Sequence, residues 1–171
     1  MRFSALSSED LDTFLAPGIQ GDRRRVLLRG ALGSPGRLRN LYQDSEWETE
    51  RQKIVAWYIE EPTWDILRRL KFAEERDAEL KDRDEWRHLW RTWQTLSRDR
   101  ILLSLGAQDE QFINPDAAPI LRRMPSLNMA VLQKRYAETN DALGQLQTNT
   151  SPRLIAESLL LSWLQDPVHS M

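Results

Sequence analysis

Tryptophans repeat at the period of an α-helix in the middle of the chain. Trp86, Trp90 and Trp93 stand at positions i, i+4 and i+7, so they share one face if this segment is helical. A second apolar stripe runs from Leu132 to Leu146 with a similar rhythm. Strand signals are nearly absent, because the sequence has no alternating run of β-branched residues and no Asn-Gly or Asp-Gly hairpin turn. The sequence therefore predicts an all-α protein.

The first 43 residues predict three short helices separated by glycine and proline. The stretch SSEDLDTFLA opens with a serine three residues before an acid, which is close to a capping box. Its expected apolar face comprises Leu11, Phe14 and Leu15. Asp22 can cap a second helix that ends at Gly33. Ser34 can cap a third helix with Pro35 in its first position, so GSPGR is expected to be a helix stop followed at once by a helix start.

Longer helices are expected beyond residue 43, with turn sequences such as GAQDEQFINPD between them. Their predicted ranges are 46–60, 63–81, 83–105, 116–123, 126–147 and 151–165. The last of them is apolar nearly all round, so we expect it to be buried. The residues expected to form the core or a subunit interface are Trp86, Trp90, Trp93, Leu143, Leu146, Leu154, Leu159 and Trp163. A change of composition near residue 44 predicts a small three-helix domain over residues 1–43 and a helical bundle over residues 44–171.

Composition argues against several kinds of site. The chain has no cysteine, which excludes disulfides, zinc–thiolate sites and a cysteine nucleophile. Neither His88 nor His169 stands at ligand spacing from another strong ligand, and the seven glycines form neither of the common nucleotide-binding patterns. We therefore expect no metal, no cofactor, no small-molecule substrate and no enzyme activity of the chain's own. The lack of a signal peptide and of an apolar run of about 20 residues predicts a soluble, cytoplasmic protein without a membrane partner.

The one local excess of positive charge lies in the N-terminal quarter, where residues 1–43 hold seven arginines against four acids. The candidate contacts to phosphate or DNA are Arg23, Arg24, Arg25, Arg29, Arg37 and Arg39. These side chains also suit an ordinary solvated helix surface. The corner at GSPGR has two interpretations as well, because an anion can rest on the helix that starts at Pro35, although a plain helix corner is the simpler one.

Four stretches, in order along the chain, resemble the C-terminal part of the delta-prime subunit of the bacterial DNA polymerase III clamp loader. RFSALSSEDLDTFL is similar to the start of the family's lid domain, and LLRGALGSPGRLRNL is similar to the lid segment that contains GSPGRAL. SRDRILLSLGAQDEQFINPD is similar to a collar-domain element in which an Arg-Asp pair is followed by Asn-x-Asp. YAETNDALGQLQTNTSPRLIAESLLLSW is similar to the closing helix pair, with Thr150 and Ser151 in place of the usual Val-Asn.

The resemblance implies a lid-like segment over residues 1–43 and a collar domain over residues 44–171, without the ATPase-type domain that precedes them in the family. In the ATPase subunits an arginine in the GSPGR corner senses nucleotide, whereas here Gly36 falls at that place and Arg37 follows it, which is the delta-prime pattern. The resemblance thus implies a non-catalytic subunit whose collar helices assemble with other loader subunits and support sliding-clamp loading in DNA replication. Contact with DNA is expected only through the complex.

Two other functions are compatible with the sequence. The long tryptophan-rich helices suit a free-standing adaptor that docks on another protein. The arginines between residues 23 and 39 suit a helical DNA-binding domain, whose affinity would fall steeply with salt. An all-α enzyme is the weakest alternative, because the sequence offers no evident base, nucleophile or metal-ligand set.

Overall fold

The structure is a computed structural model that describes residues 6–43, 46–80 and 82–166. Within these ranges, the secondary structure consists of nine α-helices and three short 3-10 helices, with no strand. The prediction of an all-α fold is therefore confirmed. In the same part of the chain, no helix combines the length and the apolar content that crossing a membrane requires.

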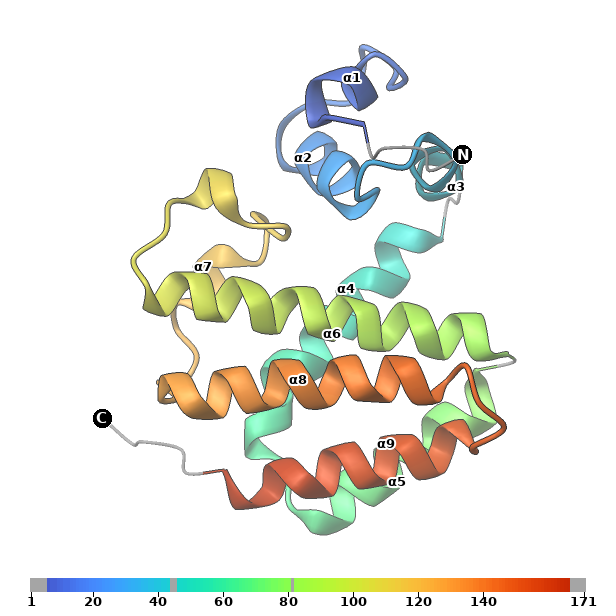
Figure 1. The fold of residues 1–171 in the computed structure, drawn as a ribbon, viewed down its shortest axis with the longest axis vertical. Coiled ribbons are helices and arrows are strands. Elements are labelled where there is room, and N and C mark those ends of the chain that lie inside the picture. The colour runs from blue at the N-terminus through green and yellow to red at the C-terminus, as the bar shows by residue number, and fades with distance from the viewer. Residues whose placement is uncertain (1–5, 44–45, 81, 167–171) are drawn as a thin grey trace.

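Three helices form a small unit at the N-terminal end: α1 (Ser8–Asp12), α2 (Gly21–Gly30) and α3 (Pro35–Gln43) (Figure 1). A capping box starts α1, because Ser7 Oγ accepts a hydrogen bond from Asp10 N at 3.1 Å and the Asp10 carboxylate accepts one from Ser7 N at 3.3 Å. The unit's own apolar cluster consists of Leu11, Leu15, Ile19, Leu27, Ala31 and Leu38. Phe14 was predicted to belong to this apolar face but is 61 % exposed. α1 ends before residue 14, so the helical spacing that would align Phe14 with Leu11 does not continue that far.

The corner between α2 and α3 stops one helix and starts the next. α2 ends at Gly30, three residues before the predicted Gly33. The backbone then passes through left-handed conformations at Leu32, with φ 50°, and at Gly33, with φ 79°, a region that favours glycine. Ser34 caps α3 as predicted, and its Oγ accepts a hydrogen bond from Arg37 N at 3.3 Å.

Six further helices form a bundle beneath this unit (Figure 1). They are α4 (Trp47–Glu60), α5 (Ile66–Glu79), α6 (Arg83–Ser104), α7 (Ala118–Leu121), α8 (Met129–Gln145) and α9 (Pro152–Ser162). The long helices α6 and α8 lie side by side, and α4 crosses behind α6. α5 and α9 pack against each other as a second layer below α8. Short 3-10 helices occupy Glu61–Thr63, Asp109–Gln111 and Trp163–Gln165.

Two helices, α5 and α8, begin three residues later than predicted, and the side chain that caps each one explains its start. α5 follows Asp65, whose carboxylate accepts a hydrogen bond from the third residue of the helix at 2.7 Å. α8 follows Asn128, whose Oδ1 accepts a hydrogen bond from the third residue of that helix at 2.8 Å. The predicted cap Asp22 instead lies inside the first turn of α2 and pairs with Arg25. The helix predicted over 116–123 shortens to the single turn of α7.

Tryptophan side chains occupy the centre of the bundle core. The predicted residues found in or against this core are Trp86, Trp90, Trp93, Leu143, Leu146, Leu159 and Trp163. The four tryptophans are at most 2 % exposed. The ring of Trp93 stacks on that of Trp163 with centroids 5.7 Å apart, and its Nε1 donates a hydrogen bond to the carbonyl oxygen of Ile54 at 3.1 Å. Leu154, also predicted for the core or an interface, is 59 % exposed. The prediction that α9 is buried on all sides is therefore wrong.

A buried ion cluster beside this core joins the 3-10 helix Glu61–Thr63, α5, α8 and the end of the described chain after α9. Glu61 accepts hydrogen bonds from Arg69 of α5 and, at 2.7 Å, from Arg135 of α8. Arg135 also donates to Asp166 at 2.7 Å, and Arg69 donates to the carbonyl oxygen of Leu160 in α9 at 2.9 Å. The four charged side chains are at most 5 % exposed. Burial opposes the charge on Arg135, but Glu61 and Asp166 outweigh it and raise the pKa of Arg135 above its ordinary value.

Separate apolar clusters lie on the two sides of the predicted domain boundary. One consists of residues between 11 and 38, with Trp47 of α4 packed against it, and two others consist of residues between 54 and 163. Residues 44–45, next to the boundary, lie outside the described residues. The division of the chain into two domains at residue 44 therefore stays a prediction.

Candidate functional site

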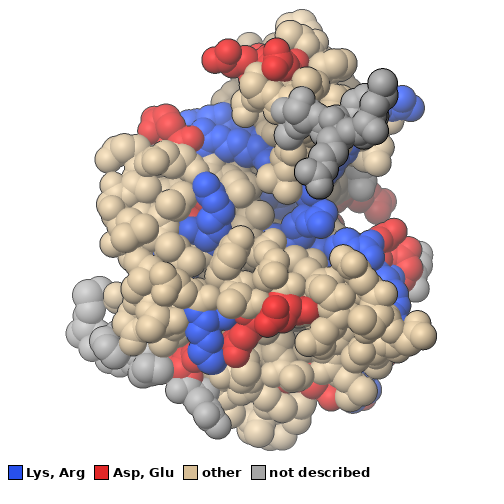
Figure 2. Space-filling view, in the orientation of Figure 1, with Lys and Arg blue, Asp and Glu red and all other residues tan. Residues whose placement is uncertain are grey.

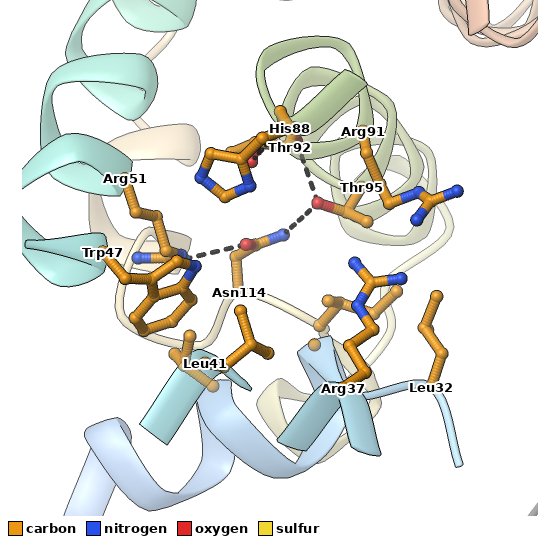
Figure 3. A pocket seen from close by; sticks show the side chains of 13 residues that line it. Leu32, Arg37, Leu41, Trp47, Arg51, His88, Arg91, Thr92, Thr95 and Asn114 are labelled. Carbon is orange, nitrogen blue, oxygen red and sulfur yellow. Dashed lines mark hydrogen bonds between the residues drawn. The ribbon is translucent and has the colours of Figure 1, made fainter. Parts of the chain in front are cut away.

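A small cavity lies where the N-terminal helices meet the bundle (Figure 3). Its walls come from α2, α3, α4, α6 and residues 113–114, and its volume is about 40 Å³. It adjoins a larger groove of about 1000 Å³ between α3, α4 and the first half of α6. The residues that line both are Arg37, Leu41, Trp47, His88 and Arg91. This junction is the candidate functional site, because it gathers polar and cationic side chains from distant parts of the sequence.

The side of α6 that faces the cavity is polar, whereas another side of the same helix carries the core tryptophans. His88, Arg91 and Thr95 recur at helical spacing along this polar side. Thr92 Oγ1 donates to the carbonyl oxygen of His88 at 2.9 Å, and Thr95 Oγ1 donates to that of Thr92 at 2.8 Å. Thr95 Oγ1 also accepts a hydrogen bond from Asn114 Nδ2 at 3.2 Å. The helix thus supports the core and the site at the same time (Figure 3).

A hydrogen-bonded network beside the cavity joins α4, α6 and the loop that follows α6. The Asp99 carboxylate accepts hydrogen bonds from Ile113 N at 3.0 Å, from Asn114 N at 2.7 Å and from Asn114 Nδ2 at 2.9 Å. Asn114 Oδ1 accepts one from Arg51 at 2.8 Å. Arg51 also donates to both carboxylate oxygens of Asp116, at 2.6 and 3.0 Å. The loop is therefore fastened to two helices through charge-assisted hydrogen bonds that are buried at Asp99 and Asn114 and partly exposed at Asp116.

The carboxylate of Asp99 is fully buried at the centre of this network. Burial raises the pKa of Asp99 above its ordinary value, whereas the N–H groups of Ile113 and Asn114 and the charge of Arg98 act in the opposite direction. The Arg98 guanidinium lies 3.1 Å from the carboxylate. All these groups hold the loop in place, so the raised pKa has a structural cause and does not by itself mark a catalytic acid.

Three of the arginines predicted to contact phosphate pair with acids instead. Arg23, Arg24 and Arg25 form ion pairs with Glu48, Asp12 and Asp22, respectively. Arg24 also donates hydrogen bonds to three carbonyl oxygens between residues 12 and 19. The hydrogen bond from Arg24 lowers the pKa of Asp12. These charges hold the N-terminal unit together and attach it to α4.

Arg29 and Arg39 lie in different surroundings. Arg29 donates a hydrogen bond to the carbonyl oxygen of Phe112, and burial together with the charge of Arg25 lowers its pKa. Arg39 is exposed on α3, and its Nε donates to Gln43 Oε1 at 3.4 Å. The six predicted arginines therefore do not converge on one place.

Arg37 is the one predicted arginine that lines the cavity. It is half-buried near the start of α3, and its guanidinium is directed toward that of Arg91 on α6 (Figure 3). Burial lowers the pKa of Arg37, and repulsion by Arg91 lowers it further. Within residues 6–43, 46–80 and 82–166, neither guanidinium has a hydrogen-bond or ion-pair partner. Figure 2 shows other Lys and Arg side chains gathered along the same junction.

Arg51, Arg91 and Asn114 were not among the predicted site residues. Arg91 had a local signal, because it stands between His88 and Thr95 on a polar stripe of α6. Arg51 and Asn114 had none, since 63 residues separate the two partners of their hydrogen bond. Contacts of this kind depend on how the helices pack against one another and cannot be predicted from the spacing of residues along the sequence.

Within the described residues, no group of three or more His, Cys, Asp or Glu side chains is arranged to hold a metal ion. His169 lies outside those residues. No family model, no curated protein and no solved structure matches the chain. A functional assignment therefore rests on the chain's own residues and their geometry.

Proposed function

We propose that this chain is a non-catalytic structural subunit, or a fragment of one, of a bacterial DNA polymerase III clamp loader, similar to the delta-prime subunit. The observation that supports this most is the network of Asp99, Asn114 and Asp116. These three residues belong to the collar-like motif SRDRILLSLGAQDEQFINPD, and in the structure Asn114 joins Asp99 to Arg51 through buried hydrogen bonds, while Asp116 pairs with Arg51 at the edge of the network. A chance similarity of sequence would not require these motif residues to contact one another in the fold.

The order of the parts also supports the proposal. A three-helix unit precedes a helical bundle, the GSPGR stretch forms the α2–α3 corner, and the fourth similar stretch covers most of α8 and all of α9. In this proposal, residues 1–43 correspond to the lid and residues 44–171 to the collar. The chain acts in the cytoplasm without a catalytic site or cofactor of its own, and it reaches DNA only through the complex.

Assembly with other subunits requires apolar side chains on the surface, because the tryptophans predicted for an interface, Trp86, Trp90, Trp93 and Trp163, are already buried in the core. The exposed apolar side chains on and next to α5 and α9 are Ile66, Leu67, Leu154 and Leu164. Large side chains of this kind supply most of the free energy of protein interfaces. We therefore assign the contact with other loader subunits to the α5–α9 layer.

Mixing the chain with the other subunits of a bacterial clamp loader tests the proposal. In analytical ultracentrifugation we expect a stoichiometric complex, and Leu154→Glu should weaken it about ten-fold or more by placing a charge in the interface. Leu105→Glu is the matched control, since Leu105 is similarly exposed but lies at the C-terminal end of α6.

The absence of any complex with the unmodified chain would overturn the proposal and leave the free-standing adaptor as the better alternative. An equal loss in both variants would contradict the assignment of the interface to α5 and α9.

A further inference from the structure

Two like charges meet at the cavity between the N-terminal unit and the bundle. Arg37 of α3 and Arg91 of α6 approach each other at one side of the cavity, and in the described part of the chain no acid neutralises either (Figure 3). The neighbouring arginines Arg51 and Arg98 both pair with aspartates. Bringing two guanidinium groups together in a partly dehydrated place is unfavourable unless an anion lies between them.

The surroundings of this pair suit an oxyanion. Each guanidinium presents a planar set of N–H donors that matches the oxygens of a phosphate group. Leu32 lies beside Arg37, Leu41 and Trp47 supply apolar wall on the opposite side, and His88 lines the same cavity (Figure 3). Apolar walls exclude water and strengthen hydrogen bonds to a charged group.

The size and charge of the site favour a single phosphate group over a nucleic acid. The inner cavity of about 40 Å³ is too small for a base or a sugar. The adjoining groove of about 1000 Å³ has room for the rest of a small molecule, but it carries six carboxylates against four cationic side chains. The carboxylates are those of Glu46, Glu50, Glu79, Asp82, Asp84 and Glu85. A long polyanion laid along this groove would be repelled.

We propose that Arg37 and Arg91 together bind one phosphate group, either inorganic phosphate or a phosphate carried by a small molecule. The group acts as a ligand and not as a substrate. Because one arginine belongs to α3 and the other to α6, a bound phosphate fastens the N-terminal unit to the bundle. The site does not depend on the clamp-loader proposal and is tested on the isolated full chain.

Titration with sodium phosphate tests this site, with sodium chloride at equal ionic strength as the reference. By isothermal titration calorimetry we expect saturable binding of phosphate, and Arg37→Gln and Arg91→Gln should each weaken it about ten-fold or more. Arg39→Gln is the matched control, because it removes the same charge from the same helix at an exposed position. Equal weakening in all three variants, or no binding to the unmodified chain, would overturn the proposal.

Thermal unfolding gives a second test, because a purely structural role of Arg91 would not make the effect of Arg91→Gln depend on phosphate. In chloride, Arg91→Gln should unfold at the same temperature as the unmodified chain or at a higher one, because the substitution removes the repulsion with Arg37. In phosphate, the order should reverse, since only the unmodified chain gains from the ligand. If Arg91→Gln unfolds earlier in both buffers by the same amount, the phosphate site is ruled out.

Three probes distinguish the possible sources of the phosphate group. Tighter binding of a nucleoside monophosphate than of inorganic phosphate supports a phosphorylated small molecule, and equal binding supports the free ion. A single-stranded oligonucleotide should bind no better than the monophosphate. Affinity that rises with oligonucleotide length and falls equally on replacement of Arg37 or Arg39 would replace the proposed site with a nucleic-acid surface.

Discussion

Replacing Glu61 by glutamine should break the buried ion cluster while keeping the shape of the side chain. Glu61 is 1 % exposed and accepts hydrogen bonds from Arg69 and Arg135. An amide keeps one acceptor oxygen but turns an NH₂ group toward guanidinium donors. Asp166 then remains as the acid that pairs with Arg135, which it shares with Lys134, and Arg69 keeps only carbonyl oxygens as acceptors.

The size of the effect follows from the burial of the cluster. Removing one partner of a buried ion pair costs about 3–5 kcal/mol, because the remaining charge is neither hydrated nor paired. For a chain of this length, each kcal/mol lowers the midpoint of thermal unfolding by about 2–4 °C. Glu61→Gln should therefore unfold about 6–20 °C below the unmodified chain.

Urea unfolding followed by tryptophan fluorescence measures the loss of unfolding free energy. Trp163 reports on the cluster, since the Arg135 guanidinium lies 4.6 Å from the centre of its ring. Glu48→Gln is the control, because Glu48 pairs with Arg23 at 3.2 Å on the surface and should cost less than about 1 kcal/mol. Combining Glu61→Gln with Arg135→Gln should cost less than the sum of the two single changes. The reasoning is refuted if Glu61→Gln costs no more than Glu48→Gln.

Three further perturbations test other parts of the structure. Arg24 lowers the pKa of Asp12, so the stability from this pair is present at neutral pH and is lost as the pH falls below the ordinary carboxyl pKa and through the lowered pKa of Asp12. Asp12→Asn should remove this pair's share of the pH dependence in urea titrations across this range. Gly33→Ala should cost about 1 kcal/mol in thermal unfolding, because φ is 79° there. Asn114→Ala should cost about 2–3 kcal/mol in urea unfolding, since it leaves Arg51 without one of its buried acceptors.

Helices and the tryptophan core could be predicted because both depend on local order in the sequence. The spacing of Trp86, Trp90 and Trp93 specifies one buried face once the segment is helical. The helix ends were less certain, because several polar residues compete to cap each helix. Asn128 caps α8, whereas Asp22 pairs with an arginine and caps nothing. The spacing predicts Phe14 on the apolar face, but Phe14 is exposed because α1 stops after little more than one turn.

The candidate site was harder to predict, because its residues acquire their roles from distant partners. An excess of arginine marked the N-terminal quarter, but Arg23 meets Glu48 on the next helix and Arg29 meets the carbonyl of Phe112, 83 residues away. Arg37 is distinguished from the others only by the approach of Arg91. Net charge along a segment does not reveal which of its cations remain unneutralised after folding.

The buried ion cluster has a consequence for synthesis on the ribosome. Glu61 meets Arg135, which is made 74 residues later, and Arg69 binds the carbonyl of Leu160, made 91 residues later. Until those residues emerge, Glu61 and Arg69 have only each other as partners in the cluster, and the α5–α9 layer cannot close. The apolar cluster between residues 11 and 38 needs only nearby sequence and can form much earlier. The N-terminal cluster can therefore reach its final packing before the α5–α9 layer does.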